Sequence, residues 1–331
     1  MSTLKDVARE AGVAVSTVSR AFTHPERLNR DTVARVREVA LQLNYQVNPL
    51  AKALITGRSP VIGMLVTNIT TPFMTSVIKA AQAEAYDHGL WLAVGDTDNQ
   101  PSHEDEWSQT MSGLAQGLIL VGAGSDDETL RRIADQAPLV LIQREVSGVA
   151  SLRQESRPGQ VQVVEHLLHL GHERLAYLPG PEQFWIARHR LASLRAVCAE
   201  LGAELVVMPH SPPELAAARD LTTAVLETGA TAALCFNDMM AQGVVVGLHQ
   251  LDLRVPRHLS VVGHDNELTR MSVPALTTID GHAIELGQRA IRRLLADEGL
   301  TRVNETLDST AVFRESTGPR PSTLRVAAAA R

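Results

Sequence analysis

The stretch LKDVAREAGVAVSTVSRAF, residues 4–22, decides the fold of the amino-terminal part of this chain. Its first half carries apolar residues at helical spacing, namely Leu4, Val7, Ala8 and Ala11. Thr3 and Asp6 form a capping-box-like start, and Gly12 ends this first helix. A second helical pattern, Val15 to Phe22, begins after only three residues, so a tight turn joins the two helices.

A third helical stripe follows in the same segment, formed by Val33, Val36, Val39, Ala40 and Leu43. Three short helices this close together are typical of a helix-turn-helix unit. In such a unit the second helix lies in the major groove, and side chains of its first turns reach base edges. We therefore expect Val15, Ser16 and Arg20 to contact bases, and Thr17 and Ser19 to contact phosphates.

The charge distribution supports a polyanion-binding amino terminus. Residues 1–60 carry nine Lys and Arg against five Asp and Glu, whereas the remaining residues carry 22 against 32. The net charge of the whole chain is −6, but its first segment is positive by 4. A basic module on an acidic body is the asymmetry expected of a nucleic-acid-binding protein.

After this unit the chain reads NYQVNPLAKALITGRSP, residues 44–60. Pro49 suits a first helical turn, and Gly57 with Pro60 stops the helix. The pattern predicts a linker with one short helix, Pro49 to Thr56.

From Val61 onward, apolar strand-like runs alternate with helical patterns. The runs are VIGMLVT (61–67), WLAVGDT (91–97), GLILVGA (117–123), LVLIQ (139–143), RLAYLPG (174–180), LVVMP (205–209), AALCFN (232–237) and LSVVGHDN (259–266). The helical patterns span residues 73–88, 102–114, 126–136, 160–170, 186–201, 213–227, 239–251 and 283–296, and a last strand region spans 305–315. This alternation predicts two successive α/β units with parallel sheets.

Several motifs together resemble the LacI/GalR family of bacterial transcription regulators. They are residues 4–22, Asn44-Tyr45 with NPLAKAL (48–54), LGHERLAYLPGP (170–181), RHRLASL (188–194), FNDMMAQGV (236–244), LRVPRHLSVVGHDN (253–266) and PALTTID (274–280). The resemblance implies a DNA-binding domain over residues 1–47, a hinge helix and linker over 48–60, and an effector-binding and dimerisation body over 61–316. That body would consist of two subdomains similar to periplasmic sugar-binding proteins, followed by a loose tail, 317–331.

The resemblance also assigns roles to the linker. Leu54 matches the hinge-helix leucine that the family inserts into the minor groove, where an apolar wedge kinks the duplex. Lys52 is expected to meet a phosphate. A plain amphipathic linker helix is the alternative. One departure precedes the second helix, because the family usually has a capping serine where this chain has Ala14.

For the body, we expect a small-molecule site at the carboxyl ends of the parallel strands. Arg190, Asn237 and Asp265 resemble the family's effector-contacting residues, and Phe73 falls where many members place an aromatic ring. These four residue types suit a polyol, because carboxylates, amides and guanidinium groups bind hydroxyls and an aromatic face covers a sugar ring. Gly122 to Ser125 and Arg144 also follow strand-like runs.

Two further points concern this site. Asp238 is expected to cap the helix that starts at Met239 rather than to bind the effector. Many family members have Asp-Asn where this chain has Glu155-Ser156, which leaves the identity of the effector open.

Three other kinds of site have weak support. VGAGSDD (121–127) begins like a dinucleotide loop, but Asp127 replaces the third glycine. The HxxHxxH motif of His166, His169 and His172 drifts around a helix that Gly171 ends, so we expect no metal site. No GxSxG elbow appears and no nucleophile is paired with a base, so we expect neither an enzyme nor a cofactor.

The sequence thus predicts a ligand-responsive, DNA-binding regulator, in first place a homodimeric repressor of a sugar or sugar-acid utilisation operon. The same architecture with a nucleoside, nucleobase or phosphorylated corepressor is the alternative, and a sugar-converting α/β enzyme or a solute receptor fits less well. Cys198 and Cys235 lie in apolar stretches, as expected of buried thiols in a reducing cytoplasm. We expect no membrane partner, because no run approaches about 20 apolar residues.

Overall fold

The amino-terminal part of the chain is helical, as the sequence predicts. A computed structural model of the protein describes residues 2–45, 59–267, 269–296 and 304–321. Its first elements are α1 (Leu4–Ala11), α2 (Val15–Thr23), the 3-10 helix η1 (Pro25–Arg27) and α3 (Arg30–Gln42). A small apolar core joins them, made of Val7, Ala8, Ala11, Val18, Ala21, Val36, Val39 and Ala40.

The ends of these helices follow from local chemistry. Thr3 and Asp6 form the expected capping box, in which each side chain meets the other residue's backbone N–H. Gly12 ends α1 in the left-handed region, at φ 61°, and donates its N–H back to the carbonyls of Ala8 and Arg9. Ala14, at the start of α2, provides no side-chain cap.

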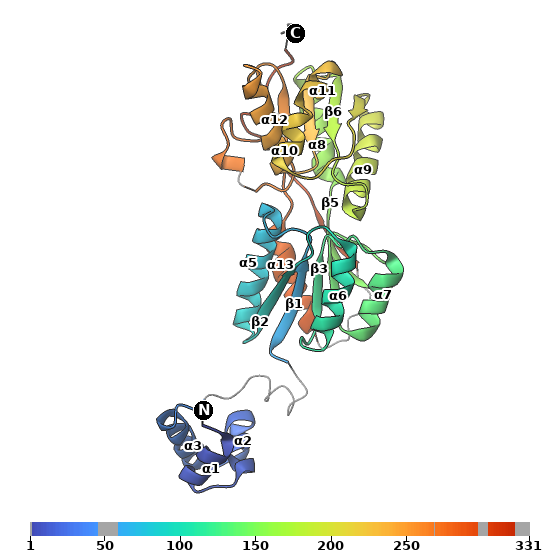
Figure 1. The fold of residues 1–331 in the computed structure, drawn as a ribbon. Coiled ribbons are helices and arrows are strands. Elements are labelled where there is room, and N and C mark those ends of the chain that lie inside the picture. The colour runs from blue at the N-terminus through green and yellow to red at the C-terminus, as the bar shows by residue number, and fades with distance from the viewer. Residues whose placement is uncertain (1, 46–58, 268, 297–303, 322–331) are drawn as a thin grey trace. The chain divides into compact units, whose positions relative to one another are not determined.

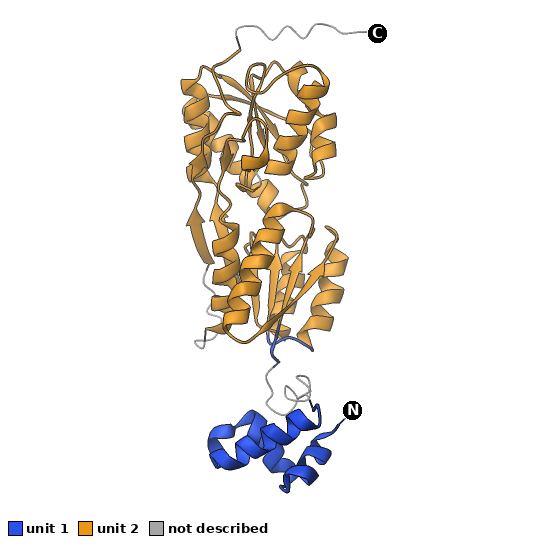
Figure 2. Cartoon of the chain, turned by 90° about the vertical axis from the view of Figure 1, so that its left-hand side faces the viewer, with its two compact units in different colours: residues 1–61, 114–116 blue, residues 62–113, 117–331 orange. Residues whose placement is uncertain are grey.

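The chain divides into two compact units, residues 1–61 with 114–116 and residues 62–113 with 117–331 (Figure 2). The first contains the helices above, and the second is the α/β body. The predicted hinge helix, Pro49 to Thr56, with Lys52 and Leu54, lies outside the described residues.

The first lobe of the body is built on a six-stranded sheet of order β11-β5-β4-β3-β1-β2 (Figure 1). Its strands are β1 (Val61–Val66), β2 (Trp91–Asp96), β3 (Leu118–Val121), β4 (Leu139–Ile142), β5 (Ala150–Glu155) and β11 (Asn304–Asp308). Helices α5 (Pro72–Asp87) and α13 (Ala283–Leu295) share an apolar core with one face. Helices α6 (Pro101–Ser112) and α7 (Asp127–Gln136) lie on the other face.

The second lobe carries a four-stranded sheet of order β7-β6-β8-β9 with parallel pairing throughout. Its strands are β6 (Arg174–Leu178), β7 (Glu204–Val207), β8 (Ala232–Cys235) and β9 (Ser260–Val262). Helices α8 (Arg157–His169) and α9 (Trp185–Leu201) pack on one face. Helices α10 (Leu215–Asp220), α11 (Thr222–Glu227) and α12 (Asp238–Gln250) pack on the other. The predicted fold class is confirmed.

In the described part of the chain, three segments cross between the lobes. The first joins β5 to α8, the second joins the short strand β10 (Thr278–Ile279) to α13, and the third joins β11 to β12 (Ala311–Val312). Ser309 joins the third crossing to the first, because its hydroxyl donates to the Ser156 carbonyl at 3.1 Å and accepts the Gly159 N–H at 2.9 Å. A side chain on Gly159 would collide with Ile279 on the second crossing.

The structure departs from the sequence expectations at several places. Strand β5 was not predicted, because its sequence ASLRQE alternates weakly and ends in polar residues. The single region expected over 305–315 is two strands, β11 and β12, in two different sheets. The helix expected over 213–227 is broken into α10 and α11.

Part of the expected loose tail is packed against the body. The Gly318 N–H donates to the Ser260 hydroxyl at 3.1 Å, and the Arg320 N–H donates to the Leu170 carbonyl at 2.8 Å. Arg320 also pairs with Glu173 at 3.0 Å. The second lobe therefore includes the described residues 317–321.

Helix α12 lies against α10 and the start of α11 through two glycines. A Cβ on Gly243 would stand 2.2 Å from the Leu215 carbonyl oxygen, and one on Gly247 would stand 2.2 Å from the Thr222 hydroxyl oxygen. This close approach positions the amino terminus of α12, which borders the site described below.

We predict that Gly243→Ala destabilises the body by about 1–3 kcal/mol, because backbone atoms must move to admit the new methyl group. Chemical denaturation, followed by the fluorescence of Trp91, Trp107 and Trp185, measures the change. Gly113→Ala is the matched control, because a Cβ there meets nothing closer than 3.8 Å. Equal stabilities of the two variants would contradict the packing argument.

Candidate functional site: a DNA-reading helix and an inter-lobe cavity

Helix α2 presents the predicted DNA-reading residues on its outer surface. Val15 is 42% exposed, and Ser16 and Arg20 are also exposed. Val18 and Ala21, on the opposite side of the helix, are buried in the core of the helical unit. Ser16 and Arg20 are four residues apart, so they share one face of the helix. Thr17 and Ser19 are half-buried. Val15, Ser16 and Arg20 are thus open to solvent and Thr17 and Ser19 partly so, and their contacts with DNA stay a prediction. Lys52 and Leu54 lie outside the described residues.

In the body, a cavity lies at the carboxyl ends of the parallel strands and is walled by both lobes. It adjoins a second hollow of about 280 Å³ with which it shares Thr71, Phe73, Asn237 and Asp265. All four predicted effector residues, Phe73, Arg190, Asn237 and Asp265, line the cavity. The sequence reasoning missed Thr67, Thr71, Met74, Asn99, Gln143, Phe184, Ile186, Pro213 and Phe236.

A buried ion pair forms the second-lobe wall of the cavity. The guanidinium of Arg190 donates to Asp265 Oδ1 at 3.0 Å and to the Phe236 carbonyl at 2.7 Å. It also lies 4.9 Å from the centre of the Phe236 ring. Arg190 is only 3% exposed, yet its Nε has no hydrogen-bond partner. The pair therefore leaves a buried donor unsatisfied at the cavity.

Asp265 is held in a strained backbone conformation, at φ 105°. Its N–H donates to the Ile279 carbonyl at 2.8 Å, and its own carbonyl accepts the Gly281 N–H at 3.2 Å. Gly281 has no room for a side chain, because a Cβ would stand 3.0 Å from the Asp265 Cα. Burial raises the pKa of Asp265 to about 6, and the Arg190 charge opposes that rise.

Asn237, and not Asp238 as expected, caps helix α12. Asn237 is the N-cap of α12, and its Oδ1 accepts the Met240 N–H at 2.8 Å. Asp238 is not the cap. Its two carboxylate oxygens instead accept the Glu267 N–H at 2.7 Å and the Thr278 hydroxyl at 2.7 Å, and burial raises its pKa. The expected capping role of Asp238 is therefore wrong, because the residue clamps the loop at Glu267 rather than a helix end.

Aromatic rings make up much of the remaining wall. Phe73 is 5% exposed at the start of α5, and Phe184 and Phe236 are similarly buried in the second lobe. Phe236 follows β8 directly, so the strand-end rule could have identified it. Phe184 precedes α9 in a loop and carried no such signal.

The backbone N–H groups of the loop after β3 are already hydrogen-bonded to a side chain of the protein itself. The Glu104 carboxylate accepts the N–H groups of Gly124 and Ser125, at 2.8 and 2.9 Å, and the Ser125 hydroxyl. These amides are therefore not available to a dinucleotide phosphate. Arg144 pairs with Asp127 at 2.7 Å and does not line the cavity.

The three histidines of the HxxHxxH motif point to different partners. His166 contacts the Thr317 hydroxyl, His169 its own helix at the Glu165 carbonyl, and His172 both Thr231 and Gly318. Among the described residues, no group of three or more His, Cys, Asp or Glu side chains could hold a metal ion. None of the described helices is long and apolar enough to cross a membrane.

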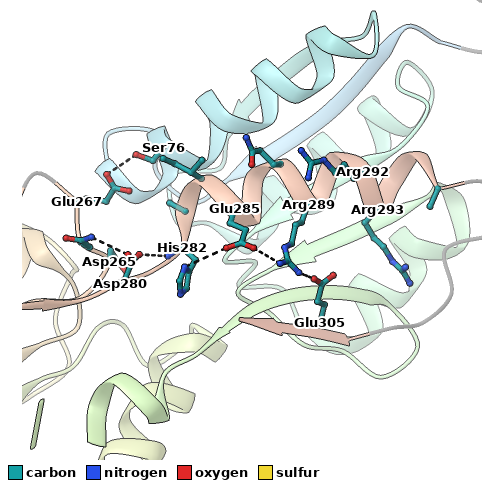
Figure 3. Close-up of a pocket in the computed structure, with 15 residues that line it drawn as sticks. Ser76, Asp265, Glu267, Asp280, His282, Glu285, Arg289, Arg292, Arg293 and Glu305 are labelled. Atoms are coloured by element: carbon teal, nitrogen blue, oxygen red, sulfur yellow. Dashed lines mark hydrogen bonds and ion pairs between the residues drawn. The ribbon is translucent and has the colours of Figure 1, made fainter. Parts of the chain in front are cut away.

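A larger groove, of about 880 Å³, runs along α13 (Figure 3). Its side chains pair with one another: Arg289 bridges Glu285 and Glu305, and the Ser76 hydroxyl donates to Glu267 Oε2 at 2.9 Å. Burial raises the pKa of Glu267 to about 7. Because Arg289 and Arg292 on its walls are already paired with Glu285, Glu305 and Glu84, and the groove is open, the smaller cavity between the lobes is the better ligand site.

Comparisons with known proteins agree with this geometry. Residues 3–48 match the model for bacterial regulatory proteins of the lacI family, and residues 164–317 match the model for the periplasmic binding protein-like domain. The ribose operon repressor of Escherichia coli (strain K12) is 30% identical over 307 residues, which cover 89% of this chain and 92% of that protein. The transcriptional regulator GalR of the same strain is 28% identical and covers 96% of each chain.

The structural comparison extends over both units. A crystal structure of the Lac repressor dimer bound to operator and the anti-inducer ONPF matches with a TM-score of 0.85 and 27% identity. The match covers 96% of this chain and 99% of that one. The chain therefore belongs to the lacI family of bacterial regulatory proteins, as a ligand-responsive, DNA-binding transcriptional regulator and not an enzyme.

Proposed function

We propose that this protein is a repressor of a carbohydrate-utilisation operon, whose operator affinity changes when a sugar-like effector binds between the lobes. The observation that carries the proposal is the cavity, where aromatic rings and the Arg190–Asp265 pair meet at the carboxyl ends of the strands. Rings of this kind cover the apolar face of a sugar, and the polar groups bind hydroxyls. Relatives and structural matches include ribose operon repressors and a regulator complexed with cellobiose.

A nucleoside effector is the second candidate. Phe73, Phe184 and Phe236 offer more aromatic surface than a small sugar needs, and they suit the stacking of a base. A repressor named CytR is among the relatives. Thermal-shift measurements separate the two candidates, because the true effector raises the melting temperature of the folded protein.

The response depends on relative movement of the lobes. Ligand contacts come from both sides of the cavity, with Phe73 on the first lobe and Arg190 on the second. An effector that binds one arrangement of the lobes more tightly shifts the population toward it. We propose that this shift reaches the DNA-binding unit through the segment that precedes β1.

We further propose that the protein acts in the cytoplasm, where its DNA partner is, as a homodimer. The described surface has large apolar side chains left open, including Met271 at 82% and Val273 at 91% exposure. On the first lobe, Leu92 and Val94 are only half-buried on the edge strand β2. Apolar surface of this kind is expected where two copies meet.

Arg20→Ala should reduce discrimination between operator and random DNA by about 1–3 kcal/mol, because its guanidinium is placed to pair with a guanine edge. Operator sequences are first selected from a randomised duplex pool with the wild-type protein, and affinities are then measured at one salt concentration. Arg37→Ala, at an exposed position on α3, serves as the control and should leave discrimination unchanged. If Arg20→Ala weakens both kinds of DNA equally, Arg20 is a phosphate contact.

Asp265→Asn should lower effector affinity at least tenfold while leaving ligand-free operator binding intact, because the amide keeps the shape and loses the charge that orients Arg190. Operator binding with and without effector measures both properties. Asp87→Asn, on the exposed end of α5, is the matched control. A wild-type response from Asp265→Asn would show that the cavity is not the effector site.

A further inference from the structure

A contact between the lobes, outside the inter-lobe cavity, places a histidine against charged side chains. His189 lies on α9 of the second lobe, and Arg153 and Glu155 lie at the end of β5 in the first (Figure 1). The His189 Nε2 is 3.6 Å from Glu155 Oε1 and 3.5 Å from Arg153 Nη1. One nitrogen of the imidazole therefore faces both a carboxylate and a guanidinium of the opposite lobe.

The first-lobe side of this contact is held by its own ion pairs. Arg153 pairs with Glu155 at 2.6 Å and, through Nε, with Glu145 at 3.1 Å. Glu145 also accepts the side-chain amide of Asn304, on β11, at 2.8 Å. These bonds lie within the first lobe, so the charged cluster keeps its geometry when the lobes move relative to each other.

The second-lobe side is positioned by an aromatic ring. Trp185 lies one turn before His189 on α9, and the two rings stack with their centres 4.7 Å apart and their planes at 11°. The side chain of His189 is 29% exposed and that of Arg153 is 14% exposed. The imidazole is thus held in one orientation against the first lobe, in a partly desolvated place.

The two protonation states of His189 meet this cluster differently. A neutral ring can accept an N–H of Arg153 at Nε2, whereas a protonated ring presents a second donor and a second positive charge to that guanidinium. Burial lowers the pKa of His189, and the Arg153 charge lowers it further, while the charges of Glu155 and Glu145 oppose this change. In the described arrangement the ring is therefore mostly neutral at pH 7.

Separation of the lobes would return the imidazole to water, where the pKa of histidine is about 6.5. A group with a lower pKa in one arrangement than in the other stabilises the first arrangement when it is deprotonated. The contact between α9 and β5 is therefore fully favourable above about pH 6.5 and weakens as the pH falls below that value.

We propose that His189 is a proton-sensitive contact between the lobes, whose protonation disfavours the arrangement in which α9 meets the end of β5. A proton then acts as a second input to the regulator, beside the effector. The inference rests on the lobe movement of the proposed function, but on no particular effector.

A second titratable group between the lobes has the opposite sign and must be separated from His189. Glu267 of the second lobe accepts the hydroxyl of Ser76, on α5, at 2.9 Å. Burial, with the charges of Asp265 and Asp280, raises its pKa to about 7. Its protonation therefore favours the described arrangement. Glu267→Gln removes this titration and keeps an acceptor for Ser76, so this variant is the reference protein.

Energy transfer between fluorophores on the two lobes measures the arrangement in the full chain without effector. Glu128→Cys on α7 and Glu227→Cys on α11 provide exposed attachment points, whereas the native Cys198 and Cys235 are buried. Doubly labelled chains are mixed with an excess of unlabelled chains, so that transfer within one chain is observed.

In the Glu267→Gln reference, we expect transfer to fall between about pH 8 and about pH 5, the range in which histidine changes charge. Adding His189→Gln should abolish this loss of transfer. Adding His249→Gln instead, at an exposed position on α12, is the matched control and should leave the loss unchanged.

Nuclear magnetic resonance of Cε1-labelled histidines tests the contact itself. The His189 signal is identified by its absence in His189→Gln. We expect His189 to titrate below the ordinary value of about 6.5, Arg153→Met to raise its pKa and Glu155→Gln to lower it further. A role limited to packing would not produce these opposite changes.

An equal response of transfer to pH with and without His189 would overturn the proposal. So would a His189 titration at or above about 6.5. The proposed function is judged separately at constant pH, by operator binding and by the response of transfer to D-ribose, cellobiose and adenosine. Its failure there, with the pH response of His189 intact, would count against the effector and not against the proton-sensitive contact.

Discussion

A buried ion pair between Arg190 and Asp265 is the interaction on which the effector side of this protein depends. Two charges removed from water are costly unless their geometry is good, and here the guanidinium also binds the Phe236 carbonyl and lies near its ring. The pair ties the end of β8, the middle of α9 and the loop after β9 into one wall. Asp265 adopts its unusual backbone conformation where Gly281 leaves space for it.

Other contacts in the body hold the residues of this cavity wall in position. The short approach of α12 to α10 places Asn237 beside Arg190, and Asp238 clamps the loop that carries Asp265 and Glu267. Contacts such as Ser76 with Glu267 and Gln154 with Asp280 join the lobes around the cavity without filling it. A cavity built this way changes shape when the lobes move, which is what a ligand-controlled regulator requires.

Much of the fold and part of the candidate site could be predicted from the sequence. The same physical reasons explain which elements and residues were missed. The helix-turn-helix and most strands have strong periodicity. Arg190, Asn237 and Asp265 lie in motifs that resemble the family, and Phe73 was assigned from the resemblance alone. Strand β5 could not be predicted, because its sequence ASLRQE is polar. The role of Gln154 could not be predicted either, because its hydrogen-bond partners, Asp280 and His264, are more than 100 residues away in the sequence. Asp238 was assigned the wrong role because the cap depends on where α12 begins, and helix ends are uncertain by a residue or two.

The most direct test of this account is a double-mutant cycle on the ion pair. The free energies of unfolding of Arg190→Met, Asp265→Asn and the double variant are measured in urea, with the tryptophan fluorescence of the body as the probe. Each single change leaves one buried group unpaired and should cost about 3–5 kcal/mol, and the double change should cost clearly less than their sum. Additive effects, within about 0.5 kcal/mol, would show that the two residues are independent and would contradict the central role of the pair.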